Sequence, residues 1–298
     1  MTTMGLAPNP VTPTTASDSM RTGRTRMRRV VVAVPVVIFG LYVVAGVLGP
    51  LFIDYSPVGG ELDDRLLPPG SVVSDGSTAV FGTDALGRDL FGQVVYGART
   101  SLVIGTLVVL FSGLVGITVG TVAGYLRGKT DLVASRVIDV LLAFPGILLA
   151  IVIAGVFDRS LAIVVIALSV TNWISFARLS RSMAMTLRER DWVKSATVMG
   201  VRRGRIIARH ILPFIAGPTL ALATTEFAAA ILAEASLSFL GLGLPSASVS
   251  WGQTIASGKE YLASAWWISA IPGIALAVLV ICVGFTGDRL TRYFSRQQ

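Results

Sequence analysis

Six long apolar runs limit what this 298-residue chain can fold into more than any other feature of its sequence. A helix needs about 20 mostly apolar residues to cross the hydrocarbon core of a bilayer. Lipid offers no partner to unpaired backbone groups, and the runs lack the alternating polarity of a membrane β-barrel. The sequence therefore predicts an all-α polytopic membrane protein with six transmembrane helices, at residues 30–52, 101–126, 132–157, 161–177, 211–240 and 265–285.

Composition argues against a soluble enzyme and against a disordered protein. Charged residues make up 14% of the chain and hydrophobic residues 53%, whereas soluble domains carry about 25% charged residues. The chain has one cysteine, Cys282, and one histidine, His210. Neither an intramolecular disulfide nor a Cys/His metal site can therefore form within it. We expect no cofactor and no bound metal.

The positions of Lys and Arg predict which side of the membrane each loop faces, because short cytoplasmic loops are enriched in both. With the N-terminus inside, 19 of the 25 basic residues lie on the inner side and five on the outer side. Both termini are therefore predicted to be cytoplasmic. The first run is too long for the apolar core of a signal peptide, so we interpret it as a retained anchor. A positive inner face suits anionic lipid headgroups and requires no nucleic acid.

Two connections are long enough to contact partners. The outer one, residues 54–100, is net acidic, and a short amphipathic helix is predicted after an N-cap at Thr83-Asp84. This segment is either a spacer or a dock for an extracytoplasmic partner. The inner one, residues 178–210, interleaves nine Lys and Arg residues with apolar side chains. That pattern favours a partner-binding helix over a solvated basic loop.

Two local patterns have simple structural interpretations. Gly128-Lys129-Thr130 is similar to the end of a phosphate-binding loop, but that motif requires glycine where Ala123 stands. We interpret Lys129 as one of the basic residues that keep this loop on the cytoplasmic side of the membrane.

A stripe of small residues at every fourth position of the second run predicts close packing against another helix; its members are Ser112, Gly116, Gly120 and Gly124.

Carboxylates in the apolar runs are costly in lipid and are therefore candidates for function or for specific pairing. Arg136 and Asp139 are i,i+3 neighbours and are predicted to form a structural ion pair. Glu226 lies past the middle of the fifth run, where it should face protein or water, and Glu234 lies near its outer end. The two glutamates leave open a proton-coupled secondary transporter, although such a protein is usually longer and has inverted repeats. A membrane hydrolase is disfavoured because no G-x-S-x-G motif is present.

Four stretches resemble motifs of the C-type permease subunits of bacterial ABC importers for dipeptides, oligopeptides and nickel. The loop between the fourth and fifth runs is similar to the E-A-A-x-x-x-G-x9-I-x-L-P loop of ABC-importer permeases. The resemblance covers about residues 25 to 294. Its segments are 194–200 with 210–213 in that loop, 81–89 with 96–99 before the second run, 136–139 with 143–145 in the third run, and 234–243 with 250–252 after the fifth.

The resemblance implies a type I importer permease in the cell membrane, with no catalytic residue of its own. It implies four partners: a homologous second permease subunit, two ABC ATPase subunits and an extracytoplasmic substrate-binding protein. The substrates implied are dipeptides or oligopeptides, with nickel or haem import as the alternative. The implied division is a disordered basic tail at 1–29, an anchor helix at 30–52, an extracytoplasmic loop at 53–100, a five-helix permease domain at 101–288 and a cytoplasmic tail at 289–298.

The same resemblance implies roles for particular residues. A coupling helix near 193–200 would contact an ATPase through Val193, Lys194, Ser195, Ala196, Met199 and Gly200. The structural motif would comprise Arg136, Asp139, Pro145, Glu234, Gly241 and Gly243, and the translocation path would include Asn172, Trp173 and Glu226. This chain departs from the family at Lys194, where a glutamate is usual. We therefore expect an acidic residue on the cognate ATPase near Lys194.

Overall fold

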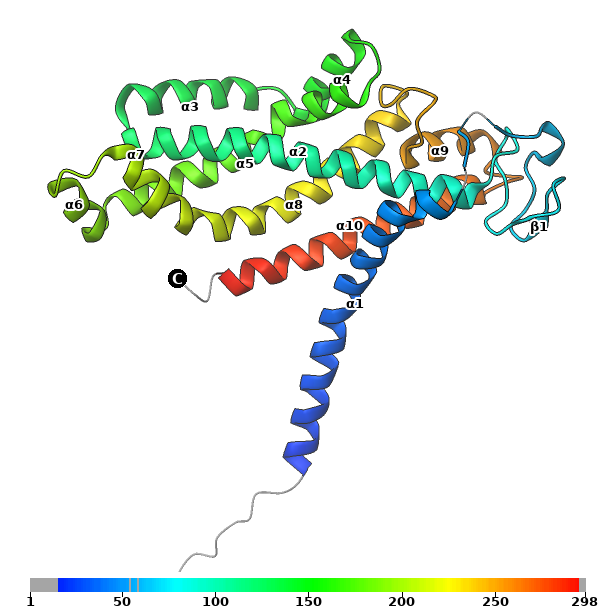
Figure 1. Ribbon diagram of the computed structural model, residues 1–298, viewed down its shortest axis with the longest axis horizontal. Coiled ribbons are helices and arrows are strands. Elements are labelled where there is room, and N and C mark those ends of the chain that lie inside the picture. Colours follow the sequence, from blue (N-terminus) through cyan, green and yellow to red (C-terminus); the bar gives the residue numbers. More distant parts are fainter. Residues whose placement is uncertain (1–15, 54, 58, 295–298) are drawn as a thin grey trace, which may run out of the picture.

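The computed structural model describes residues 16–53, 55–57 and 59–294. Most of the long helices run along one another, whereas the N-terminal helix points away from them over much of its length, and short elements lie at both ends and along one side of the bundle (Figure 1). The long helices are α1 (Ala16–Phe52), α2 (Leu90–Leu126), α5 (Leu161–Arg188), α8 (Leu212–Phe239) and α10 (Trp267–Phe294). The shorter helices are α3 (Gly128–Leu142), α4 (Gly146–Val156), α6 (Asp191–Val198), α7 (Arg203–Ile206), the π-helical η2 (Ile207–Ile211) and α9 (Trp251–Gly258).

Within the described ranges, five helices are long and apolar enough to cross a membrane, or up to six if α3 and α4 form one span. The prediction of one helix over 132–157 is wrong, because α3 and α4 meet at an angle of 81°. Pro145 is the N-cap residue of α4. Proline has no N–H to donate to the backbone hydrogen bonds of a helix, and it disfavours a helical conformation at the residue before it, here Phe144. The break therefore falls at residues 143–145.

The predicted short helix before the second span does not exist as a separate element. Helix α2 runs without interruption for 37 residues, about 55 Å at 1.5 Å per residue, so it extends well beyond a hydrocarbon core of about 30 Å. Its N-cap is Asp89, whose carboxylate accepts hydrogen bonds from the N–H groups of Phe91 at 3.3 Å and Gly92 at 2.8 Å. The predicted cap at Thr83-Asp84 is therefore wrong.

The small-residue stripe of α2 packs against the backbone of α5, which confirms the prediction made for it. A Cβ atom at Gly116 would lie 2.4 Å from the carbonyl oxygen of Trp173, and one at Gly120 would lie 2.2 Å from that of Ala177. Only glycine permits so close an approach of two helices. Helices α2 and α5 therefore form the closely packed centre of the bundle (Figure 1).

Helix α1 reaches the bundle only near its C-terminal end. The Tyr42 hydroxyl donates to the carbonyl oxygen of Ala275 in α10 at 3.0 Å, and the Tyr42 ring meets the buried Trp251 edge to face. Residues 1–29 were predicted to form a disordered tail, and residues 1–15 of it lie outside the described part of the chain. From Ala16 onward α1 is helical, so that part of the prediction is wrong, because a helix already formed by the apolar run extends at little cost through residues such as Met and Arg.

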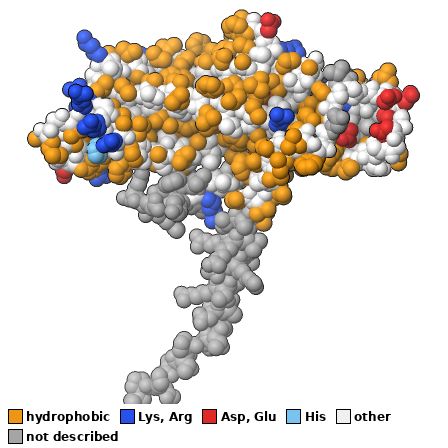
Figure 2. Space-filling model, viewed as in Figure 1, with side chains coloured by type: hydrophobic (Ala, Val, Ile, Leu, Met, Phe, Trp, Pro, Cys, Tyr) orange, Lys and Arg blue, Asp and Glu red, His pale blue; other side chains and the backbone are white. Residues whose placement is uncertain are grey.

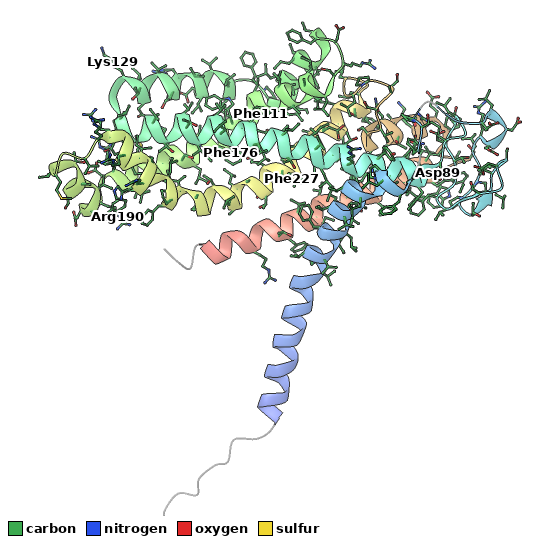
Figure 3. The ribbon with its side chains drawn as sticks, in the orientation of Figure 1. Asp89, Phe111, Lys129, Phe176, Arg190 and Phe227 are labelled. Carbon is green, nitrogen blue, oxygen red and sulfur yellow. The ribbon has the colours of Figure 1, made fainter. Side chains whose placement is uncertain are left out.

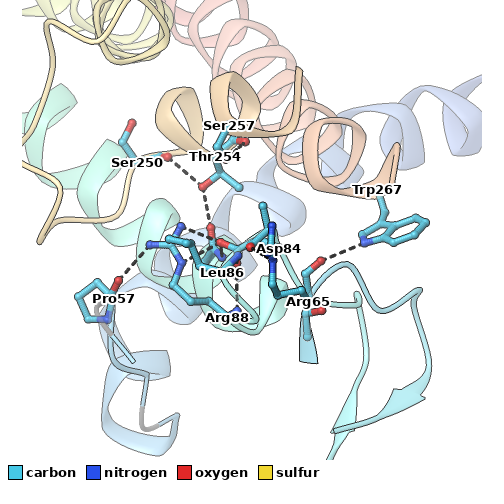
Figure 4. Close-up of polar contacts among 12 residues, drawn as sticks. Pro57, Arg65, Asp84, Leu86, Arg88, Ser250, Thr254, Ser257 and Trp267 are labelled. Carbon is cyan, nitrogen blue, oxygen red and sulfur yellow. Dashed lines mark hydrogen bonds and ion pairs between the residues drawn. The ribbon is translucent and has the colours of Figure 1, made fainter. Parts of the chain in front are cut away.

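Residues 55–57 and 59–89 form a folded cap at one end of the bundle rather than an open loop. The cap contains the 3₁₀ turn η1 (Leu62–Asp64) and the antiparallel strands β1 (Ser71–Val72) and β2 (Thr78–Ala79). Asp84 is 2% exposed and accepts hydrogen bonds from Arg88 at 2.7 Å and Gln93 at 2.8 Å. Gln93 in turn accepts from Thr254 of α9 at 3.0 Å (Figure 4). This buried polar network joins the cap to α2 and α9.

Candidate functional site at the basic end of the bundle

The end of the bundle opposite the cap carries α6, α7 and η2, which connect α5 to α8 (Figure 1). We call this region the basic end, because Lys and Arg side chains gather there while Asp and Glu gather on the cap (Figure 2). Figure 3 labels Lys129 and Arg190 at this end. Helix α6 falls close to the coupling helix predicted at 193–200.

Helix α6 is held by one apolar face. Val193 and Ala196 are 1% and 7% exposed and pack with Tyr125, Ile206 and Ile211 from three neighbouring elements. Both residues were predicted to contact an ATPase. In the structure they contact this chain instead, because positions i and i+3 share a helix face and that face covers the bundle. Their side chains position α6.

The end of α6 leaves apolar surface uncovered. Val198 is 88% exposed and Met199 is 74% exposed. Gly200 follows with a φ of +76°, a conformation that other residues rarely adopt, and the N–H of Val201 returns to the carbonyl oxygen of Ala196 at 3.1 Å. This glycine-terminated helix end aims two apolar side chains outward. Lys194 and Ser195 are also exposed. Val198 lies within the predicted coupling helix but was not among the residues predicted to contact an ATPase. It lies five residues after Val193 and therefore on a different face of α6.

An ion-pair chain ties α6 to the end of α2. Glu189 lies 2.9 Å from Arg127 and 3.5 Å from Lys194. The Arg188 guanidinium donates to the carbonyl oxygen of Tyr125 at 2.7 Å. The single carboxylate of Glu189 therefore faces two basic side chains and cannot balance the charge of both. The acidic residue expected on an ATPase near Lys194 stays a prediction. Across the described part of the chain, no cluster of three His, Cys, Asp or Glu side chains could hold a metal ion.

Three aromatic side chains cover the junction between α6 and α8. The Trp192 ring stacks on Phe214 at a centroid distance of 5.3 Å and lies 6.0 Å from the His210 ring. Neither Trp192 nor Phe214 was among the residues predicted to contact an ATPase. They are 22 residues apart, and only the return of the chain through η2 brings them together.

The three predicted path residues separate into two groups. Glu226 of α8 is partly buried, and its carboxyl group lies near Ser175 of α5. Asn172 lies one helical turn from Ser175, and its buried side-chain nitrogen has no hydrogen-bond partner among the described residues. Trp173 instead lines the grooves that α2 forms with α5 and α3. Asn172 and Ser175 share one face of α5, whereas Trp173 faces the grooves beside α2.

The predicted ion pair between Arg136 and Asp139 is wrong, because both side chains are exposed and no ion pair joins them in the described structure. Instead Asp131, earlier in α3, binds Arg181 of α5, with Nη2 and Oδ2 2.9 Å apart. An ion pair between two helices helps to hold them together, which an i,i+3 ion pair on one exposed helix face cannot do.

Glu234, Gly241 and Gly243 lie where α8 ends. Glu234 is fully buried, and its Oε1 accepts hydrogen bonds from Ser238 and from Ser250, each at 2.7 Å. Gly241 has a φ of +77° and terminates the helix. Gly243 passes so close that a Cβ would lie 2.0 Å from the Ser238 hydroxyl oxygen. The three residues and Ser250, which caps α9, fix the turn from α8 to α9.

The chain is similar to known transport proteins in both sequence and fold. Residues 116–298 match the family described as the inner membrane component of binding-protein-dependent transport systems. A putative peptide transport system permease protein of Brucella suis biovar 1 is 41% identical over 274 residues, which cover 92% of this chain and 90% of that protein. The dipeptide transport system permease protein DppC of Alkalihalophilus pseudofirmus is 40% identical over 210 residues, covering 70% of this chain and 69% of the relative.

A solved inward-facing structure of the MetNI methionine ABC transporter shares the fold. Its TM-score is 0.57 at 19% identity, covering 69% of this chain and 97% of the solved chain. Identity this low supports the fold alone, whereas the family match covers more than half of this chain. The chain therefore belongs to the inner membrane components of binding-protein-dependent transport systems, as a multi-pass permease subunit with the fold of a type I ABC importer.

Proposed function

We propose that this permease subunit imports peptides and is driven through α6 by separate ATPase subunits. The observation that carries the proposal is the end of α6, where Val198 and Met199 are exposed although Val193 and Ala196 anchor the helix. Exposed apolar side chains on a firmly held helix are suited to a groove on a partner protein. Movement of an ATPase groove would then displace α6 and the spans attached to it as rigid elements.

The proposed orientation places the basic end in the cytoplasm and the acidic cap outside. Its support is the segregation of charge between the two ends (Figure 2) and the enrichment of Lys and Arg in cytoplasmic loops. In this orientation ATPases meet α6, and a substrate-binding protein meets the cap. The partners proposed are two ATPase subunits, a second permease subunit and that binding protein.

Peptide is the proposed substrate because relatives at 41% and 40% identity carry peptide or dipeptide transport names. The comparisons do not favour nickel, haem or a proton-coupled mechanism. Within this proposal Asn172 and Glu226 supply polar groups beside the path, and the domain boundaries at 30–52, 53–100 and 101–288 remain proposals. The proposed coupling surface consists of the exposed residues Lys194, Ser195, Thr197, Val198, Met199 and Gly200, and the buried Val193 and Ala196 hold α6 in place behind it.

Cross-linking tests the coupling surface directly. Cys282 is buried and is replaced first by alanine, so that Met199→Cys introduces the single thiol of the chain. The thiol is alkylated with a maleimide that carries a benzophenone, and in the assembled complex we expect illumination to insert the benzophenone into a C–H bond of an ATPase subunit. The matched control is Val156→Cys, which is 75% exposed at the end of α4 and should form no such adduct. Equal adducts from both variants, or none from Met199→Cys, would contradict the proposal.

Transport is tested in liposomes that contain the purified complex. We expect uptake of a labelled dipeptide only when ATP and the binding protein are both present. Excess unlabelled peptide should compete, whereas nickel or haem should not. Uptake driven by a proton gradient without ATP would refute ATP-driven import even if α6 is found at an ATPase interface.

A further inference from the structure

An open groove runs between α2 and α3 from the basic end toward the middle of the bundle. It has a volume of about 690 Å³, and its lining residues are Thr118, Val119, Val122, Ala123, Lys129, Thr130, Val133, Ala134, Val137 and Trp173. The Thr118 and Thr130 hydroxyls donate to carbonyl oxygens of Leu114 and Arg127, and the second of these bonds is 2.8 Å long. The wall of the groove is therefore hydrocarbon, apart from Lys129 at its mouth.

The length of the groove matches one leaflet of a bilayer. Trp173 lies beside Gly116, which is ten residues before the end of α2 at Leu126, or about 15 Å along the helix axis. Half of the hydrocarbon core is also about 15 Å thick. The groove therefore spans the distance from a headgroup region to the bilayer centre.

The shape of the groove favours an acyl chain over a protein helix. Helices α2 and α3 are joined by the single residue Arg127, so they converge at the basic end. A helix with its side chains is at least about 10 Å in diameter and does not fit between two helices that meet in this way. A single extended hydrocarbon chain is narrow enough to follow the groove to its mouth.

The mouth of the groove carries a positive charge that nothing nearby neutralises. Lys129 is exposed, and no ion pair or hydrogen bond of its ammonium group is found in the described structure. The two acidic residues on neighbouring segments are already engaged, because Asp131 binds Arg181 and Glu189 binds Arg127 and Lys194. Figure 3 shows Lys129 at the start of α3, away from the bundle centre.

We propose that this groove binds one anionic phospholipid of the inner leaflet, with an acyl chain between α2 and α3 and the phosphate against Lys129. Basic pockets between transmembrane helices on the cytoplasmic side select anionic headgroups in this manner. Gly128-Lys129-Thr130 then has a role other than nucleotide binding. The leaflet follows from the orientation proposed above, whereas lipid binding requires neither peptide nor ATP.

Photo-labelling of the assembled complex in liposomes tests the site. The probes are phosphatidylglycerol and phosphatidylcholine with the same photoreactive acyl chain, each present as a trace in phosphatidylcholine vesicles. Labelling is mapped to residues by mass spectrometry. A lysine near the membrane surface should favour the anionic probe by about fivefold, with adducts at residues 118–123 and 133–137.

Three variants make the result specific. Lys129→Gln should reduce the labelling ratio of the two probes to about one, whereas Arg209→Gln, which removes a basic charge from the same end outside the groove, should leave it unchanged. Ala134→Phe should lower labelling by both probes because it fills the groove. Protection of the buried Cys282 from a thiol reagent reports that each variant is folded.

Several outcomes would overturn the proposal. Equal labelling by both probes in the wild-type protein would mean that the groove holds lipid without selecting its headgroup. An equal loss of preference in Lys129→Gln and Arg209→Gln would mean that surface potential alone attracts the anionic probe. Absence of groove labelling by either probe would mean that another protein segment covers it.

Discussion

Replacement of Gly120 by alanine tests whether contact between α2 and α5 holds the bundle together. A Cβ atom at Gly120 would lie 2.2 Å from the carbonyl oxygen of Ala177 and 2.9 Å from its Cα atom. Both obstacles are backbone, so no side chain can rotate to relieve them. The matched control is Gly113→Ala, which adds the same methyl group to the same helix, where the nearest atom is 3.9 Å away on the Phe176 ring.

The expected magnitudes follow from these distances. Relief of the contact at Gly120 requires the two helices to separate by about 1 Å, and overpacking of this kind costs about 1–3 kcal/mol. Alanine also has a helix propensity about 1 kcal/mol more favourable than that of glycine. The difference between this cost and this gain is the net effect at Gly120, so we expect Gly120→Ala to lower the free energy of unfolding by about 1 kcal/mol and Gly113→Ala to raise it by up to about 1 kcal/mol.

The single cysteine provides the assay. Cys282 is 4% exposed in α10, so a thiol-reactive fluorophore labels it only when the packing of the bundle opens. Labelling is followed during denaturant titration of the purified chain in mild detergent. Gly120→Ala should shift the midpoint to lower denaturant concentration, and Gly113→Ala should not. Equal midpoints for the two variants would refute the argument, because they would show that the close approach of α2 and α5 contributes nothing to stability.

Three further predictions concern the cap and the end of α8. Ser250→Ala removes one hydrogen-bond donor to the buried Glu234 and should destabilise the protein by about 1–3 kcal/mol in the same assay. The control Ser236→Ala removes only a hydrogen bond within α8 and should change stability by less than about 0.5 kcal/mol. Asp84→Asn weakens the pairing of Arg88 and should destabilise the cap by about 3 kcal/mol, seen as faster proteolysis within residues 59–89; a wild-type cleavage rate would contradict this. Burial raises the pKa of the Tyr55 phenol from 10.0 to about 12, so the cap should lose stability as the pH rises from about 10 to about 12, where the unfolded chain has released that proton and the folded chain has not. The tyrosinate absorbance of Tyr55→Phe should lack this late step, and an unchanged titration would show that Tyr55 is not the group responsible.

The membrane class and most helix positions could be predicted from the sequence because both depend on local properties. The length of an apolar run decides whether it can cross a bilayer, and no distant residue changes that requirement. The glycine stripe of α2 was recognisable for the same reason, since spacing along one helix defines one face. Its partner was not recognisable, because nothing in the stripe identifies Trp173 or Ala177 on α5.

Predictions from local sequence were wrong where one segment contained more than one suitable start for a helix. Asp84 and Asp89 are both suitable N-caps, and only the folded cap decides between them. Asp84 is bound by Arg88 and Gln93, which leaves Asp89 to begin α2. Pro145 was recognised as part of a motif, but the 81° change of direction at residues 143–145 depends on how α3 and α4 pack on the bundle.

The candidate site shows where sequence information ended and packing took over. The alternation of apolar and basic residues between α5 and α8 indicated a partner-binding helix, because so much apolar surface needs a cover. Which side chains cover it depends on the tertiary structure. The bundle covers Val193 and Ala196, leaves Val198 and Met199 exposed, and pairs Lys194 with Glu189. A helical period specifies that an apolar face exists, whereas the surface that buries it is specified only by the neighbours that folding brings there.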